Sequence, residues 1–196
     1  GRIADIIDYT LIKIFQDLDP IGAIGNIGYT KRKVAEKSNA EPIEIRPKKT
    51  SPYSIVITMD GYLIKEDDLK AELEEEYTFS TDNKTEVVGS LLHKYISEEG
   101  VTFEAGRKLV DKLHGRATFA IVALVHEGKE IYMVALNDDR AFEPFCFATI
   151  NGTFVASSES CSHRRLNGVT EREYLGAEMT ICSSKGCQTK RVREET

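Results

Sequence analysis

The chain has 196 residues, of which 41% are hydrophobic and 30% charged, a balance typical of a globular protein with one sizeable core. Its formal net charge of -6 argues against a nucleic-acid-binding surface, because phosphate binding needs clustered Lys and Arg. No apolar run approaches the roughly 20 residues that span a bilayer, and the first residues lack the order of a signal peptide, which argues against a membrane protein and predicts a cytoplasmic one.

The predicted elements fall into a mainly helical first half and a strand-rich second half. Apolar spacing predicts a short helix within residues 3–15, and β-branched and aromatic residues predict a buried strand at 53–58 that Gly61 ends. Helical periodicity follows at 65–76, 87–96 and 103–113. Strands are then predicted at 117–125, 130–136, 145–150, 153–157 and 178–182, joined by turns into an antiparallel meander.

This order of elements lacks the regular alternation of strands and helices. It therefore indicates the α+β class, with helices layered on antiparallel sheets. We expect one domain, residues 1–184, followed by a frayed polar tail, residues 185–196. The sequence has no phosphate-binding loop of the Gly-x4-Gly-Lys type, so we expect no nucleotide and no other cofactor.

Four cysteines lie in the C-terminal third of the chain, at positions Cys146, Cys161, Cys182 and Cys187. They are too few and too irregularly spaced for a secreted disulfide framework, so we expect free thiols. Three of them could form a tetrahedral zinc site with His163, but their spacing is poor for zinc and no metal is expected. A relocated Cys-His nucleophile pair would need a thiol beside one of the four histidines, which are His93, His114, His126 and His163. The sequence alone brings no such pair together.

Six short segments occur in the order found in one enzyme family. Residues 59–61, Met-Asp-Gly, resemble a His-Asn-Gly motif that follows a strand, and residues 39–42, Asn-Ala-Glu-Pro, resemble Asn-Ala-Gln-Pro. Further segments are similar to other motifs of that family, at 25–30, 79–87, 137–145 and 156–161. Together they resemble the class II glutamine amidotransferases, most of all the glutaminase domain of the amidophosphoribosyltransferase type. The resemblance implies the N-terminal-nucleophile hydrolase fold, a four-layer αββα sandwich, here with its N-terminal part missing.

The resemblance also implies a nucleophile that this chain does not supply. In the family the nucleophile is an N-terminal cysteine, whose own amino group can act as the general base. This chain begins with Gly1, and residues 1–7 resemble a segment that the family places well after the nucleophile. We therefore expect the piece that carries the cysteine to be absent, and no catalytic residue within this chain.

Three positions of the implied pocket depart from the family. Gly28 stands where an arginine holds the substrate carboxylate, and Lys84 stands where an acidic residue binds the substrate ammonium. Asp60 replaces the amide donor of the oxyanion hole, and an ionised carboxylate only accepts hydrogen bonds. Loss of one oxyanion-hole donor typically costs about 10² to 10³ in rate.

Other residues near these positions are candidates to restore the lost contacts. Arg32 could replace the missing arginine, Asp82 could replace the missing acid, and Gly61 still offers its backbone N–H. Three tyrosines bracket the implied pocket and either line it or pack in the core, namely Tyr29, Tyr53 and Tyr62.

Taken together, these departures favour a catalytically degenerate domain that acts as a binding, regulatory or scaffold unit. The expected ligand is glutamine or another small amide, and the expected protein partner is a different subunit or a second copy of the chain. The alternatives are an active glutaminase whose cysteine lies upstream of Gly1, and a related activity on another amide. Taken alone, residues 60–61 could merely form a turn, and Lys84 could be a solvated residue near a helix start.

Overall fold

The computed structural model describes residue 24 and residues 40–140, 146–150, 153–157, 170–173 and 176–193. The helices are α3 (Glu66–Leu73), α4 (Lys84–Glu99) and α5 (Phe103–Leu113). The strands are β1 (Ile43–Glu44), β2 (Tyr53–Leu63), β3 (Ala117–Glu127), β4 (Glu130–Asn137), β5 (Cys146–Ile150), β6 (Thr153–Ser157), β7 (Thr170–Glu173), β8 (Glu178–Ser183) and β9 (Gly186–Arg191). These elements confirm the predicted α+β class.

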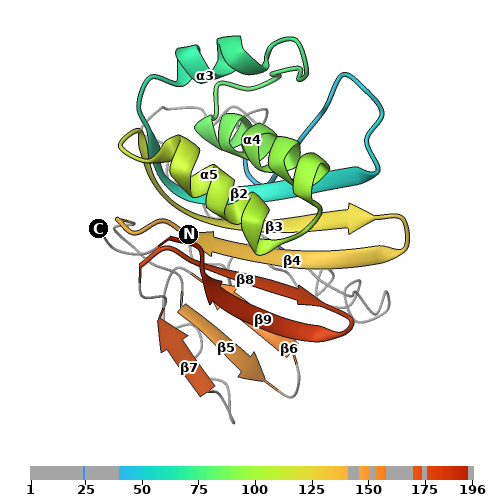
Figure 1. Cartoon of the computed structure of the whole chain (residues 1–196), viewed down its shortest axis with the longest axis vertical. Helices are drawn as coiled ribbons and strands as arrows, with labels where there is room; N and C mark the ends of the chain where they lie inside the picture. The colour runs from blue at the N-terminus through green and yellow to red at the C-terminus, as the bar shows by residue number, and fades with distance from the viewer. Residues whose placement is uncertain are drawn as a thin grey trace.

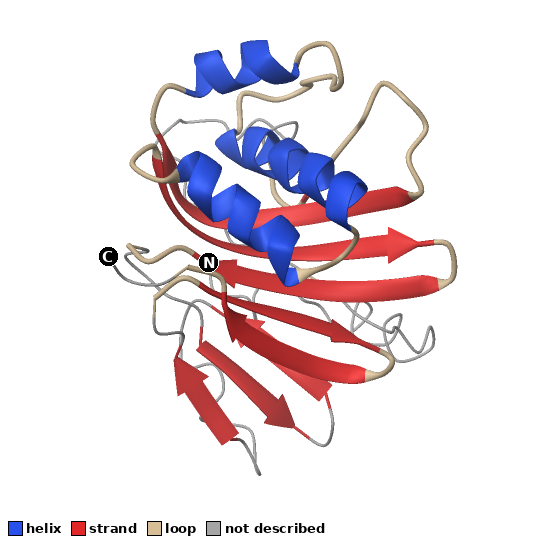
Figure 2. Ribbon diagram, in the orientation of Figure 1, coloured by secondary structure: helices blue, strands red, loops and turns tan. Residues whose placement is uncertain are grey.

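The strands form two antiparallel sheets, and helices cover one face of the larger sheet. The larger sheet has the order β1-β2-β3-β4-β8-β9, and the smaller one has the order β6-β5-β7. Helices α4 and α5 lie side by side across one face of the larger sheet, as Figure 1 shows. The smaller sheet lies on the other side, so helices, sheet and sheet follow one another (Figure 2). The helix expected within residues 3–15 lies outside the described residues.

Strand β3 separates the two cores because its side chains alternate between the faces of the sheet. Phe119 and Ile121 are fully buried in the core under α4 and α5. Ala120 and Val122 point the other way, into a smaller apolar cluster that includes Phe147 of the second sheet. The central strand is therefore apolar on both faces, which explains why its sequence reads as a continuous hydrophobic run.

Helices α4 and α5 begin and end where local signals predict. Asn83 caps α4 by accepting a hydrogen bond from the Thr85 N–H, and Thr102 caps α5 by accepting one from the Ala105 N–H. Gly100 ends α4, with its N–H bonded to a carbonyl one turn earlier. The helices predicted at 87–96 and 103–113 are confirmed, and the one predicted at 65–76 is shorter, since α3 ends at Leu73.

Strand β2 is longer than the sequence suggests. It runs without interruption to Leu63 and pairs with β3 along its whole length, with Asp60 opposite Ala120 and Gly61 opposite Phe119. The prediction that Gly61 ends the strand is wrong, and so is the interpretation of residues 60–61 as a turn. Pairing with β3 overrides the local preference of Asp-Gly for turns.

The C-terminal region also differs from the prediction of a single meander and a frayed tail. Strands β5, β6 and β7 leave the main sheet, and β8 returns to pair with β4. Residues 186–191 of the expected tail form β9, which pairs with β8. A disulfide joins Cys182 to Cys187 across this hairpin, so the expectation of free thiols is wrong for these two.

Among the helices that the structure describes, none has the length and apolar character needed to cross a bilayer.

Candidate functional site

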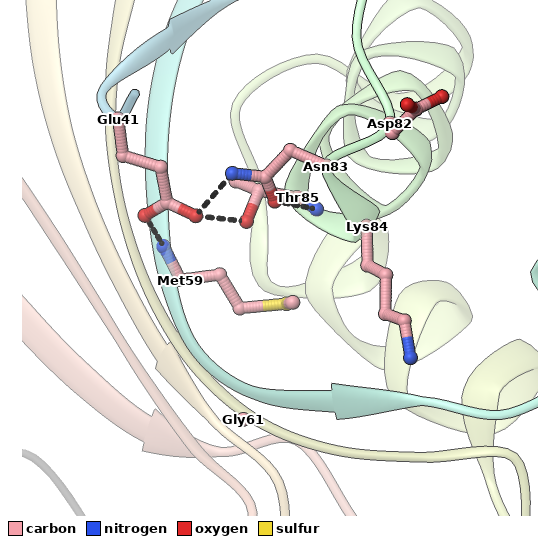
Figure 3. A pocket seen from close by; sticks show the side chains of 7 residues that line it. All are labelled: Glu41, Met59, Gly61, Asp82, Asn83, Lys84 and Thr85. Atoms are coloured by element: carbon pink, nitrogen blue, oxygen red, sulfur yellow. Dashed lines mark hydrogen bonds between the residues drawn. The ribbon is translucent and has the colours of Figure 1, made fainter. Parts of the chain in front are cut away.

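Glu41 lies beside β2 and joins that strand to the beginning of α4. Its Oε2 atom accepts hydrogen bonds from the Met59 N–H at 2.9 Å and from the Thr58 hydroxyl at 2.5 Å. Its Oε1 atom accepts from the Asn83 amide at 3.2 Å and from the Thr85 hydroxyl (Figure 3). Four donors on two carboxylate oxygens need an acceptor-only side chain, which glutamate supplies when ionised.

Glu86 fixes the loop that precedes α4. Its carboxylate is 1% exposed and accepts hydrogen bonds from the Ser80 N–H at 2.9 Å and the Thr81 N–H at 2.8 Å. The hydroxyls of Ser80 and Thr81 donate to the same carboxylate, at 3.1 and 2.7 Å. Backbone N–H bonds to a charged acceptor are among the stronger hydrogen bonds in proteins. Glu86 thereby holds the loop next to Asp82 and Asn83.

A cavity of about 300 Å³ lies beside Glu41 at the N-terminal end of α4. It is lined by Glu41, Met59, Gly61, Asp82, Asn83, Lys84 and Thr85. Three of the residues that the sequence placed in a pocket thus share one cavity, namely Gly61, Asp82 and Lys84.

The Lys84 ammonium is held against the end of β2. Its Nζ atom donates to the Leu63 carbonyl at 3.0 Å and lies 4.0 Å from the Glu66 carboxylate. The side chain is 45% exposed, which partly bears out the view of Lys84 as a solvated residue, although its head group is anchored. In Figure 3 it extends away from Glu41. A second cation that entered this cavity would be repelled by Lys84.

Gly61 occupies a position that no other residue can take. Its φ angle is +136°, and a Cβ atom there would lie 2.1 Å from the backbone oxygen of Thr118 and 2.8 Å from the Cα of Phe119. Both contacts are with the backbone of β3, which cannot move aside. The glycine is therefore required by the fold itself.

Asp60 lies on the opposite face of β2 from the cavity. Its neighbours Met59 and Leu63 belong to the core beneath the helices, so the alternation of the strand directs Asp60 to the other side. Its partner in β3, Ala120, belongs to the cluster between the sheets. Asp60 is exposed, and it is not among the residues that line the cavity.

His93 belongs to a buried structural network. It is 2% exposed, its Nδ1 atom lies 2.8 Å from the Tyr77 hydroxyl, and its Nε2 atom lies 3.3 Å from the Tyr53 carbonyl. Because a carbonyl can only accept, Nε2 carries the proton and Nδ1 accepts from Tyr77. Burial lowers the pKa of His93 below its ordinary value. The contacts around His93 are those of a packed histidine, with Tyr53 and Tyr77 as its partners.

Comparison with known proteins identifies the family of this site. Residues 34–162 match the glutamine amidotransferase domain. The chain belongs to this family. The matched region includes Glu41, the strand β2 motif at 59–61 and the loop that Glu86 holds.

The relatives within the family include enzymes of two types. The chain is 31% identical over 155 residues to an amidophosphoribosyltransferase of Archaeoglobus fulgidus, a match that covers 79% of this chain and 32% of the relative. A second amidophosphoribosyltransferase, of Methanocaldococcus jannaschii, is 25% identical over 140 residues, covering 71% and 28%. The glutamine–fructose-6-phosphate aminotransferase of Staphylococcus epidermidis is 31% identical over 138 residues, covering 70% and 21%. The chain spans about a third or less of the length of these relatives.

Two solved structures share the fold. One is described as the allosteric regulatory enzyme of purine biosynthesis, with a TM-score of 0.59 at 23% identity, covering 81% of this chain and 32% of that one. The other is the glutamine phosphoribosylpyrophosphate amidotransferase of B. subtilis, with a TM-score of 0.60 at 23% identity, covering 84% and 34%. The predicted N-terminal-nucleophile hydrolase fold and the resemblance to the amidophosphoribosyltransferase type are confirmed, and the described residues form three layers of the expected four-layer sandwich.

Several predicted site residues fall outside the described residues. These are Gly28, Tyr29 and Arg32, together with residues 1–7. They remain predictions drawn from the sequence. Cys161 and His163 also lie outside, while the disulfide removes Cys182 and Cys187 from the set of metal ligands considered for zinc.

Sequence reasoning missed the two carboxylates that organise the site. Glu41 was seen only as a departure in the segment 39–42, although its four hydrogen bonds join β2 to α4. Glu86 had a local signal, because it follows the cap residue Asn83 by three positions, as the acid of a capping box does. In this structure it reaches further back along the loop than that motif requires.

Proposed function

We propose that this glutamine amidotransferase domain has lost the family's glutamine chemistry and acts as a binding, regulatory or scaffold unit. The observation that carries the proposal is the fixed position of Asp60. Pairing of β2 with β3 places Asp60 opposite Ala120, and this pairing continues without a break along the strand before and after Asp60. A one-residue shift of the pairing, which would bring a neighbouring residue to this position, would move every side chain of β2 to the other face of the sheet. The resemblance aligns Asp60 with the family's amide donor, and the strand directs its carboxylate away from the cavity that Gly61 and Lys84 line, so this position supplies no side-chain donor to that cavity.

With aspartate at this position, the side-chain donor of the family's oxyanion hole is lost. The tetrahedral intermediate of amide hydrolysis carries a negative charge on oxygen, which the family stabilises with hydrogen-bond donors. An ionised Asp60 offers only acceptors. Gly61 keeps its N–H, so one donor of the pair is retained in the chain.

Lys84 provides a second line of support. The resemblance places it where an acidic residue binds the ammonium of glutamine, and here Lys84 lines the cavity while its own ammonium is held at the end of β2 by the Leu63 carbonyl at 3.0 Å. Two like charges in one small cavity repel each other. The cavity as built disfavours an amino acid bound in the family's orientation.

The alternative is an active glutaminase whose cysteine lies upstream of Gly1. One observation favours it, because Asp82 lines the same cavity as Gly61 and could bind the ammonium in place of the missing acid. The archaeal relatives are amidophosphoribosyltransferases, so glutamine is the substrate to test first.

Ammonia release from glutamine by the full-length natural protein tests the proposal. We expect no release above the rate of buffer alone, and no heat of binding when glutamine is titrated at millimolar concentration. Turnover at the rates of an ordinary amidotransferase would overturn the proposal and support the alternative. In that case Asp82→Asn should weaken glutamine binding, while Asp68→Asn on the exposed surface of α3 should leave it unchanged.

A further inference from the structure

The face of the main sheet that carries Asp60 also carries two other oxygen-bearing side chains. Asn137 ends β4 and Thr118 lies near the start of β3. Ala120 pairs with Asp60 on one side and with Asn137 on the other, so these three residues form one row across β2, β3 and β4. Thr118 lies two positions from Ala120 on the same strand and therefore on the same face.

Packing confirms which face this is. Ala120 and Ala135 belong to the small cluster between the sheets, whereas Phe119 and Leu136 belong to the core under the helices. Asn137 follows Leu136 and so points to the side of the second sheet.

Two of these oxygens are buried and lack partners. Thr118 is 7% exposed and Asn137 is 2% exposed. In the part of the chain that the structure describes, neither Thr118 Oγ1 nor Asn137 Oδ1 has a hydrogen-bond partner. The Asn137 amide nitrogen lies 3.4 Å from the Asp138 carbonyl, an orientation that directs the oxygen away from it. A buried acceptor without a donor is unfavourable, and most such groups in native proteins are satisfied.

We propose that the inner face around Asp60, Thr118 and Asn137 binds a small organic cation rich in N–H donors, of the guanidinium type. This inference deepens the proposed function, on which it rests, by naming the class of ligand. The three side chains offer acceptors, and the one charge among them is negative. A ligand that carries donors and a positive charge complements both properties.

The spacing of the strands favours a guanidinium over a metal ion. Neighbouring strands lie about 4.8 Å apart, so the backbones of β2 and β4 at Asp60 and Asn137 are about 10 Å apart. A planar guanidinium carries five N–H donors around its edge and can reach acceptors on separate strands. A Ca²⁺ or Mg²⁺ ion instead draws about six oxygens to within about 2.0 to 2.6 Å, more ligands and a tighter shell than this row provides.

Paired probes of the same shape test the inference. Methylguanidinium and N-methylurea have similar size and planar shape, but N-methylurea is neutral and carries a carbonyl oxygen where methylguanidinium carries an NH2 donor. We expect methylguanidinium to bind to the full chain in the millimolar range by NMR titration, with shifts of the Ala120 methyl and the Asn137 side-chain amide. N-methylurea should bind at least about tenfold more weakly, because hydrogen bonds to a charged group are the stronger ones.

Matched variants locate the site. Asp60→Asn should weaken methylguanidinium binding by at least about tenfold, and Thr118→Val should weaken it several-fold. Asp68→Asn removes the same charge from the exposed surface of α3 and should leave binding unchanged. Because the two probes are also compared on the unaltered chain, a variant that fails to fold does not remove the test.

Three results would overturn the inference. They are no detectable methylguanidinium binding at about 50 mM, well above a dissociation constant in the millimolar range, equal binding of the two probes, or equal weakening by Asp60→Asn and Asp68→Asn. Any of these would mean that the buried oxygens are satisfied by water or by the chain itself. Ammonia release from glutamine is a separate readout, since it would refute the loss of glutaminase chemistry whether or not methylguanidinium binds.

Discussion

Replacing Glu86 with glutamine puts an NH2 group in place of one carboxylate oxygen, next to the loop that precedes α4. The carboxylate accepts from the N–H groups of Ser80 and Thr81, and from their hydroxyls, while being 1% exposed. The Ser80 N–H reaches both carboxylate oxygens, at 2.9 and 3.2 Å, so a glutamine oxygen at the Oε2 position keeps both backbone N–H groups within reach, while its amide nitrogen faces the Ser80 N–H at 2.9 Å. The hydroxyls can rotate to accept from that nitrogen, but the backbone N–H cannot.

The expected cost follows from this count. The Ser80 N–H then faces a second donor and keeps only its longer bond, which costs about 1 to 3 kcal/mol, and both backbone bonds lose their charge assistance, which adds about 1 kcal/mol. We therefore expect Glu86→Gln to lower the free energy of unfolding by about 2 to 4 kcal/mol. For a domain of this size that corresponds to a fall in Tm of about 5 to 15 °C.

Urea unfolding monitored by far-UV circular dichroism measures this change, because the chain has no tryptophan for fluorescence. Glu75→Gln makes the same chemical change at an exposed position and should leave the unfolding midpoint unchanged within error. The loop amides should also exchange faster with solvent in the Glu86 variant. A midpoint for Glu86→Gln equal to that of Glu75→Gln would refute the role given to this carboxylate.

Three further changes test other parts of the structure. Gly61→Ala should prevent folding or cost several kcal/mol in urea unfolding, because its Cβ would lie 2.1 Å from a backbone oxygen, whereas Gly128→Ala, with nothing within 4 Å, should cost about 1 kcal/mol. Burial lowers the pKa of His93, so the unfolded state binds a proton more readily than the folded state does. The free energy of unfolding should therefore be highest above about pH 6.5 and fall as the pH drops through that value towards the folded pKa. The variant His93→Gln should flatten this slope between about pH 7.5 and 5.5. Tyr77→Phe removes the donor to His93 at 2.8 Å and should lower the free energy of unfolding by about 1 to 3 kcal/mol, where an unchanged midpoint would mean that the hydrogen bond contributes nothing.

Elements with a strong local pattern were predictable from the sequence. The bounds of α5 agree with the prediction because an amphipathic run follows the cap residue Thr102, and β6 agrees because the turn residues at 151–152 delimit it. Strands β7 and β9 were missed, since the segments 170–173 and 186–191 are polar and carry no apolar alternation. Such strands are specified by their partners β5 and β8, and a single sequence does not reveal that pairing.

The site was predictable in its membership more than in its geometry. Gly61, Asp82 and Lys84 were expected together and do line one cavity. Their separation from Asp60 was not foreseen, because a turn at 60–61 would not fix the two residues on opposite sides of a strand. The role of Glu41 depends on contacts 17 to 44 residues away in the sequence, which no local pattern encodes.

The close approach of the β3 backbone to Gly61 restricts which substitutions this motif can accept among descendants of one gene. Any lineage that keeps β2 paired with β3 must keep a glycine here, whether or not it still hydrolyses glutamine. The adjacent Asp60 is exposed and under no such steric restraint, so it can drift once the reaction is no longer needed. A glycine in this motif therefore reports the folding of this strand pair, whether or not the chain that carries it is an active enzyme.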